Sequence, residues 1–169
     1  MERAFIQTKM MAGDAGEISG IGWPFATPDR VGDMIEKGAF AETNLPLPML
    51  FDHRGDTPLG SWSEATETQE GLALKGTMLV EEVERAREVQ ALVKAGAITG
   101  ISIGFVTRKA KPRKGGGRTI SKVELVEASL VAVPMHPQAR ITSTKDALQS
   151  LRIAAAIQRA TAQFQARIT

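Results

Sequence analysis

Few side chains in this chain of 169 residues can do catalytic chemistry, because it holds only two histidines, His53 and His136, and no cysteine. Without cysteine, the chain has no disulfide, thiolate metal site or thiol nucleophile. A zinc site needs three or four ligands, and no HExxH or similar spacing supplies them. Neither a GxxxxGKS/T nor a GxGxxG pattern is present to support nucleotide chemistry. We therefore expect neither a cofactor nor a bound metal.

A serine nucleophile remains to be considered. Acyl transfer needs a hydroxyl, an imidazole within hydrogen-bond reach, and usually a third group that fixes the imidazole tautomer. Ser102 lies in the sequence Gly-Ile-Ser-Ile-Gly-Phe at residues 100–105. On a strand, the flanking isoleucines face one side, and Ser102 faces the other side between two glycines. The glycines would leave the hydroxyl open to a peptide carbonyl; the alternative is a structural serine at a bulge.

His53 is the candidate general base. It follows the apolar run 49–51 and precedes an Arg-Gly-Asp sequence that is typical of a turn, where a histidine is commonly a surface or capping residue. Asp52 is its neighbour in the sequence. Because adjacent side chains of a strand diverge, Asp52 is a poor partner for the imidazole.

Glu127 is the candidate for the third position. By strand alternation it shares a face with Leu125, Ser129 and Val131. A carboxylate on a largely apolar face needs a partner, because burying it alone is costly. A histidine is a natural partner, so we expect Glu127 to contact an imidazole.

Short strands and turns must position these residues. The sixteen glycines and eight prolines favour many short elements over a few long helices. Strands are predicted at residues 5–10, 18–25, 49–51, 60–62, 72–80, 97–109 and 119–134. The glycines and the proline within 18–25 indicate a bulge or an edge there.

The segment 81–95 departs from this pattern. Apolar residues recur there at helical spacing, at Val83, Ala86, Val89 and Val93. Gly96 is a typical C-terminal stop, and Glu81 and Arg85 are spaced for an ion pair. We expect this amphipathic helix to cover an open side of a sheet; a lid or an oligomer face is the alternative.

Positive charge is concentrated in two segments. The net charge of +2 is too small to indicate nucleic-acid binding. Six of the eleven residues 108–118 are Lys or Arg, around a glycine-rich hairpin loop. We interpret this segment as a solvated loop tip, since no aromatic residue is interleaved for base stacking. Contact with an acidic partner is the alternative.

The second basic segment is the end of the chain. Residues 143–169 are predicted to form a basic helical tail, with a narrow apolar stripe at Ile153, Ile157, Ala160 and Phe164. Residues 1–142 form the body. No stretch reaches the about 18 apolar residues of a membrane span, and the first residues form no signal peptide. We expect a soluble, cytoplasmic protein.

Several segments, in this order, resemble the tailed-phage prohead serine protease family. They are residues 21–25, 38–40, 49–53, 59–60, 71–72, 100–105, 125–131 and 133–134. The resemblance covers residues 4–141 and leaves the tail out. Its specificity comes from the ordered spacing of the segments.

This resemblance implies a β-rich α+β fold: a small antiparallel β-barrel with flanking helices, as in the herpesvirus assembly proteases. It implies a serine endopeptidase inside the immature capsid, in the host cytoplasm. Such enzymes cut a scaffold protein, or the scaffolding region of the major capsid protein, and often themselves. Ser102 would be the nucleophile, His53 the base and Glu127 the third member. The basic charge and apolar stripe of the tail favour docking onto an acidic scaffold, with removal by self-cleavage; a C-terminal helix packed on the barrel is the alternative. Homo-oligomer formation is left open.

Alternatives remain at this point. The herpesvirus relatives use a second histidine as third member, so His136 could replace Glu127, although its place between a methionine and a proline indicates an exit loop. The chain could also be a non-catalytic barrel that binds capsid or scaffold protein. In that case Ser102, His53 and Glu127 would not converge. A nucleic-acid-binding module that uses residues 108–118 is a third hypothesis.

Overall fold

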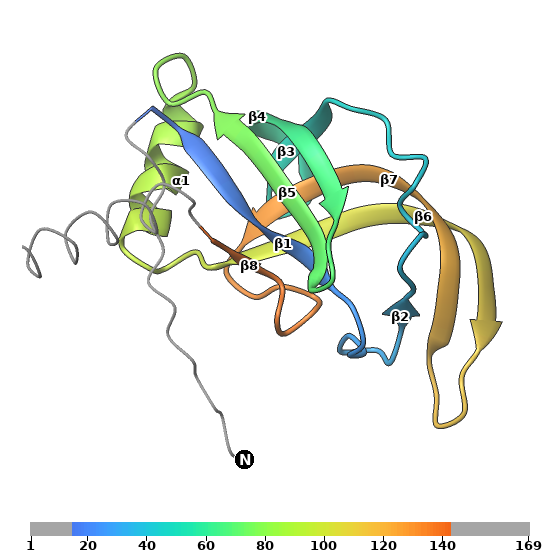
Figure 1. Cartoon of the computed structure of the whole chain (residues 1–169). Coiled ribbons are helices and arrows are strands. Elements are labelled where there is room, and N and C mark those ends of the chain that lie inside the picture. Colours follow the sequence, from blue (N-terminus) through green and yellow to red (C-terminus); the bar gives the residue numbers. More distant parts are fainter. Residues whose placement is uncertain (1–14, 143–169) are drawn as a thin grey trace, which may run out of the picture.

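The computed structural model describes residues 15–142, which form one curved sheet with a helix beside it (Figure 1). The predicted strand at 5–10 and the predicted tail at 143–169 lie outside the described residues. The elements are β1 (Glu17–Pro24), β2 (Met34–Ile35), β3 (Leu47–Phe51), β4 (Arg54–Glu67), β5 (Gly71–Met78), α1 (Glu84–Lys94), β6 (Gly100–Pro112), β7 (Arg118–Val131) and β8 (Arg140–Ile141). This part of the chain is therefore β-rich with little helix, as predicted.

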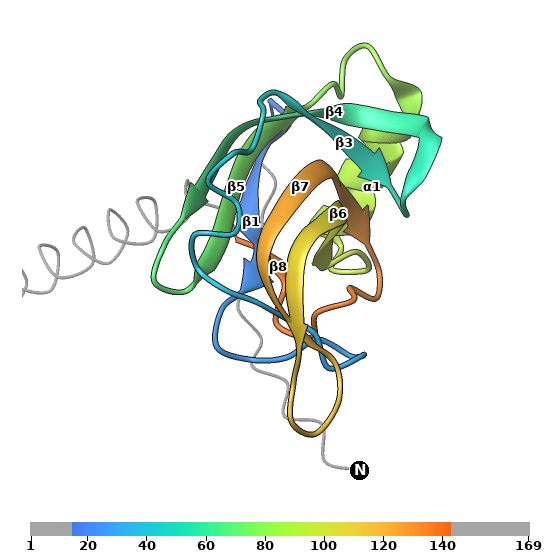
Figure 2. The ribbon, with the colours of Figure 1, turned by 90° about the vertical axis from the view of Figure 1, so that its right-hand side faces the viewer.

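The strands follow the order β2-β7-β3-β4-β5-β1-β8, and β6 pairs with β7 outside that path. β7 runs parallel to β2 and β3 and antiparallel to β6. Ala128 pairs with Met49 of β3 and also with Ile103 of β6, so these two strands occupy opposite edges of β7. Figures 1 and 2 show the long β6–β7 hairpin, whose tip projects beyond the rest of the sheet.

The expected β-barrel is wrong, because the sheet is not closed. Closure would need a ladder of backbone hydrogen bonds between β6 and the other end of the sheet. That end is β8, which is only two residues long. It is linked to the start of β6 by a hydrogen bond from the Ile141 N–H to the Thr99 carbonyl, at 3.1 Å. Such a short strand offers too few peptide groups for a ladder.

The apolar face of β6 packs closely against β1. A Cβ atom at Gly20 would lie 2.6 Å from Ile101 Cδ1, and one at Gly22 would lie 3.2 Å from Ile103 Cγ2. Both isoleucines are buried in the core, as their alternation predicts. The predicted bulge in β1 is present as a register shift between Ile21 and Trp23. This packing fixes the face of β6 that points away from the core.

The predicted helix is present as α1. Its apolar stripe, which packs against β4 and β5, contains the buried residues Ala86, Val89 and Val93. Gly96 follows the helix with a φ of 75°, a conformation that suits glycine. Within residues 15–142, no helix has the length and apolar character needed to cross a membrane.

The predicted ion pair between Glu81 and Arg85 is wrong. The helix begins at Glu84, so Glu81 precedes it and lacks the i,i+4 geometry. Arg85 instead pairs with Glu88 one turn further along, at 2.6 Å.

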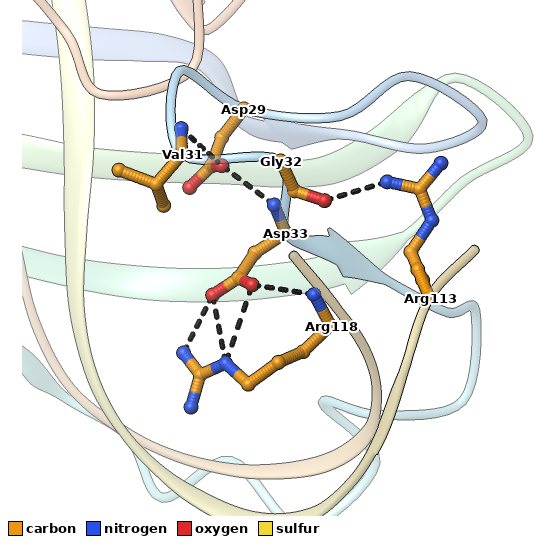
Figure 3. Close-up of polar contacts among 6 residues, drawn as sticks. All are labelled: Asp29, Val31, Gly32, Asp33, Arg113 and Arg118. Atoms are coloured by element: carbon orange, nitrogen blue, oxygen red, sulfur yellow. Dashed lines mark hydrogen bonds and ion pairs between the residues drawn. The ribbon is translucent and has the colours of Figure 1, made fainter. Parts of the chain in front are cut away.

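The tip of the β6–β7 hairpin is anchored to the loop before β2 (Figure 3). Asp33 accepts hydrogen bonds from the Arg118 backbone N–H at 2.8 Å and from its guanidinium Nη2 at 2.5 Å. The guanidinium holds the pKa of the Asp33 carboxyl below its ordinary value. Arg113 donates to the Gly32 carbonyl, and Asp29 Oδ1 accepts from the Asp33 N–H. Charge-assisted bonds thus fix the hairpin at its far end.

These contacts revise the interpretation of the basic segment. The strands extend further than predicted, so the loop is confined to residues 113–117. Within the basic segment, Arg113 and Arg118 bind the β2 loop, and Arg108 pairs with Glu124 of β7. Half of the six basic side chains therefore have structural partners, which weakens the case for a free nucleic-acid surface.

Candidate active site

Ser102, His53 and Glu127 come together where β3, β6 and β7 meet. Ser102 Oγ lies 2.8 Å from His53 Nε2, and His53 Nδ1 lies 2.7 Å from Glu127 Oε1. A carboxylate only accepts hydrogen bonds, so Nδ1 carries the proton and Nε2 is left to accept the hydroxyl proton. The His53 side chain is 45% exposed and that of Glu127 only 12%. The imidazole therefore lies at the surface, with its carboxylate partner behind it.

Antiparallel pairing of β6 and β7 places the hydroxyl and the carboxylate on one face. Ser102 pairs with Ser129, and Gly104 pairs with Glu127. A Cβ atom at Gly104 would lie 2.2 Å from Glu127 Oε1, so the carboxylate occupies the space that the glycine leaves. Likewise, a Cβ atom at Gly100 would lie 2.6 Å from the Pro134 ring. The expectation that both glycines open a path to the hydroxyl is wrong, because protein atoms fill these spaces.

His53 sits on a tight turn between β3 and β4. Phe51 pairs with Arg54, which leaves Asp52 and His53 as a two-residue loop. Both have positive φ, 51° and 59°, as in a type I′ turn. Such turns favour Asn-Gly, and a residue with a Cβ atom costs about 1–2 kcal/mol in this conformation. The turn that carries the imidazole is therefore strained and needs support from its surroundings.

That support comes from β7. The Asp52 N–H donates to the Leu130 carbonyl at 3.1 Å, and the His53 N–H donates to Ser129 Oγ at 3.0 Å. The turn is thus bonded to the strand that carries Glu127. The side chain of Asp52 is exposed, and the partner of His53 Nδ1 is Glu127.

A bulge in β7 sets the orientation of Glu127. Glu127 pairs with Gly104 and Leu125 pairs with Phe105, so Val126 is an extra residue between them. Leu125 belongs to the buried core, whereas Glu127 contacts His53 on the other face. The prediction that Leu125 and Glu127 share a face is wrong, because the bulge changes the alternation by one residue.

Ser129 takes part in the arrangement, although the sequence analysis gave it no function. It is fully buried (0% exposed), and its Oγ donates to Glu127 Oε2 at 2.7 Å. Its signal in the sequence is a hydroxyl two residues after Glu127 on a mostly apolar strand. Alternation had placed both on one face, and the structure confirms this.

His136, the alternative third member, lies elsewhere. It is 2% exposed and its ring packs edge-on against Trp23, with the ring centroids 5.1 Å apart. Nδ1 accepts the Gln138 N–H at 3.2 Å, and Nε2 is 3.0 Å from the Thr27 carbonyl. Both ring nitrogens are therefore used away from His53.

The chemistry available here is acyl transfer. A hydroxyl, an imidazole and a carboxylate in one hydrogen-bonded line are the groups that a serine hydrolase uses. Among residues 15–142, no cluster of three or more His, Asp or Glu side chains could hold a metal ion.

Comparison with known proteins gives the family. Residues 5–152 match the family model described as Caudovirus prohead serine protease, and the chain belongs to that family. It is similar to the capsid polyprotein of Pseudomonas phage PAJU2, with 35% identity over 138 residues. The match covers 78% of this chain but only 20% of that relative, so the chain spans a fifth of the relative's length.

Two herpesvirus structures also resemble the chain, each with 12% sequence identity. The protease of Kaposi's sarcoma-associated herpesvirus, in complex with a hexapeptide phosphonate inhibitor, has a TM-score of 0.48 over 74% of this chain and 63% of its own. Varicella-zoster virus protease has a TM-score of 0.49 over 74% of this chain and 62% of its own.

The space beside Gly104 yields a first prediction. In Gly104→Ala the new methyl group displaces the Glu127 carboxylate, so the imidazole loses its orientation. We expect Ser102 to react with a fluorophosphonate probe about 10–100-fold more slowly, because small misplacements have effects of that size. Intact-mass spectrometry over time measures the rate. Gly55→Ala is the control, since a Cβ atom there meets nothing within 4 Å; wild-type reactivity of Gly104→Ala would contradict the prediction.

His136 yields a prediction on pH and stability. Burial lowers its pKa below the ordinary value of 6.5, against the opposing effects of the Thr27 carbonyl and Asp29. Between pH 6.5 and the lower folded-state pKa, the His136 imidazole is therefore protonated in the unfolded chain but neutral in the folded protein. This contribution to stability is complete above pH 6.5 and is lost as the pH falls toward the folded-state pKa.

Urea unfolding at pH 7.5 and 5.5 tests this expectation. The free energy of unfolding should fall less between these two values in His136→Gln than in the wild type, each protein being compared with itself. An equal fall in both proteins would show that His136 does not contribute to the pH dependence.

Proposed function

We propose that this chain is a serine endopeptidase of prohead maturation, with Ser102 as nucleophile, His53 as general base and Glu127 as third member. The observation that carries the proposal is the hydrogen-bonded line from Ser102 Oγ through the imidazole to Glu127, at 2.8 and 2.7 Å. Membership of the prohead serine protease family agrees with it. A non-catalytic binding protein gives no reason for such a line.

In the proposed mechanism, His53 Nε2 takes the hydroxyl proton as Ser102 Oγ attacks the scissile carbonyl carbon. The tetrahedral intermediate collapses when the imidazolium protonates the leaving amine, which leaves an acyl ester on Ser102. Water, deprotonated by His53, then attacks the ester carbonyl carbon. The imidazolium returns a proton to Ser102 Oγ as the C–O bond breaks, which releases the carboxylic acid product and regenerates the hydroxyl.

The partners of the imidazole suit each step. Glu127 Oε1 accepts a hydrogen bond from the Nδ1–H group, which holds the tautomer whose Nε2 is unprotonated before attack. The same carboxylate then stabilises the imidazolium that forms. The 45% exposure of His53 lets an amine leave and water enter.

The proposed substrate is a capsid or scaffold polypeptide inside the immature particle, in the host cytoplasm. The support is the name of the similar phage protein, a capsid polyprotein five times as long as the matched segment. A capsid polyprotein with a segment like this chain would, under this proposal, hold a protease and its substrate in one polypeptide.

Co-expression with the cognate capsid protein tests the nucleophile. We expect wild type to shorten the capsid protein and Ser102→Ala to leave it full length, because loss of a nucleophile costs on the order of 10⁴–10⁶ in rate. Ser121→Ala, which removes a hydroxyl from β7 away from the proposed catalytic residues, should process normally. Normal processing by Ser102→Ala would refute the proposed role.

Self-cleavage is a separate expectation. We expect the purified protein to lose mass from within residues 143–169 during incubation, and Ser102→Ala to keep its full mass. Intact-mass spectrometry follows both samples. Equal loss from both would assign the cut to a contaminating protease.

A further inference from the structure

The hydroxyl of Ser129 joins two parts of the site. Its Oγ lies 2.7 Å from Glu127 Oε2 and 3.0 Å from the backbone nitrogen of His53. Ser129 is 0% exposed, so water does not compete for either bond.

The direction of both bonds follows from the groups involved. A serine hydroxyl has one proton to donate and two lone pairs that accept. The backbone N–H of His53 can only donate, so Oγ accepts there. The carboxylate of Glu127 can only accept, so the Ser129 hydroxyl donates its hydrogen bond to Oε2. The hydroxyl therefore has one orientation that satisfies both neighbours.

The first bond completes the hydrogen bonding of the carboxylate. Oε1 faces the imidazole, and Oε2 faces Ser129. With both oxygens held, the carboxylate cannot rotate away from Nδ1. Hydrogen bonds to a charged acceptor are among the stronger ones in proteins, so this restraint is substantial.

The second bond restrains the backbone of the base. His53 has a φ of 59°, a conformation that a residue with a Cβ atom rarely adopts. The bond from its N–H to Ser129 Oγ helps to hold it there. If the His53 backbone left this conformation, the imidazole would change direction and its Nε2 would point away from Ser102.

We propose that Ser129 is a positioning residue of this site, which fixes the carboxylate and the backbone of the base with one hydroxyl. The proposal rests on the proposed function for its effect on turnover, and on geometry alone for its effect on the imidazole. Ser129 acts through Glu127 and His53 and does not contact the reacting atoms.

Steady-state kinetics on a peptide from the cleaved capsid sequence are the first test. We expect Ser129→Ala to lower kcat by about 10–100-fold with KM unchanged, a range typical for a residue that orients catalytic groups. Ser129→Thr keeps the hydroxyl and should recover most of the loss. Ser121→Ala, on the same strand, should match wild type. A change in KM alone, or wild-type kcat in Ser129→Ala, would overturn the proposal.

A double-mutant cycle tests whether Ser129 acts through its neighbour. In a Glu127→Ala background, Ser129→Ala should lower kcat by a smaller factor than in the wild-type background, because one of its two partners is already absent and only the bond from the His53 N–H remains. A factor as large as in the wild-type background would show that Ser129 does not act through the carboxylate and would overturn the proposal.

Proton NMR tests the proposal without proteolysis. The chain holds only two histidines, so His136→Gln assigns the low-field imidazole resonance of His53. We expect that resonance to shift or broaden in Ser129→Ala and to stay in place in Ser121→Ala. If wild type cleaves no substrate, the proposed function fails while this measurement still decides the role of Ser129. An unchanged resonance in Ser129→Ala would overturn the role.

Discussion

The pairing of β7 with strands on both of its edges is the constraint on which the rest of the structure depends. Along residues 128–130, β3 binds one edge in parallel and β6 binds the other edge antiparallel. The turn that carries His53 is thereby placed at one side of β7, and Ser102 at the other side. Glu127 lies between them on β7 itself. None of the three residues would form such a site alone. They are neighbours because Glu127 lies on β7 and the other two lie on or next to strands that pair with β7.

The sequence was informative wherever simple alternation holds. It predicted that Ser102 turns away from the core while Ile101 and Ile103 turn into it, and that Glu127 needs a histidine. Alternation fails where the backbone is irregular. The extra residue Val126 changes the parity of β7, and a bulge of this kind depends on pairing with β6 that no local pattern displays.

The remaining errors have the same origin in long-range geometry. Closure of a barrel depends on the length of β8, which pairs with β1 through only two residues. The roles of the two glycines beside Ser102 could not be predicted either, because the Pro134 ring and the Glu127 carboxylate reach them from distant segments. The sequence thus predicted the fold class and the candidate residues. It did not predict the bulge, the strand ends and the side-chain contacts that hold those residues in place.

The spacing of the three side chains along the sequence has a consequence for timing. The bonds that join Ser102 and Glu127 to the imidazole span 49 and 74 residues of sequence. Contacts between residues so far apart in the sequence form late in folding, since the long chain segments between them must close first. During synthesis Ser102 and His53 would both leave the ribosome before β7 exists to hold them. A nascent chain would therefore lack the hydrogen-bonded line, and the onset of the proposed activity would be coupled to completion of the sheet.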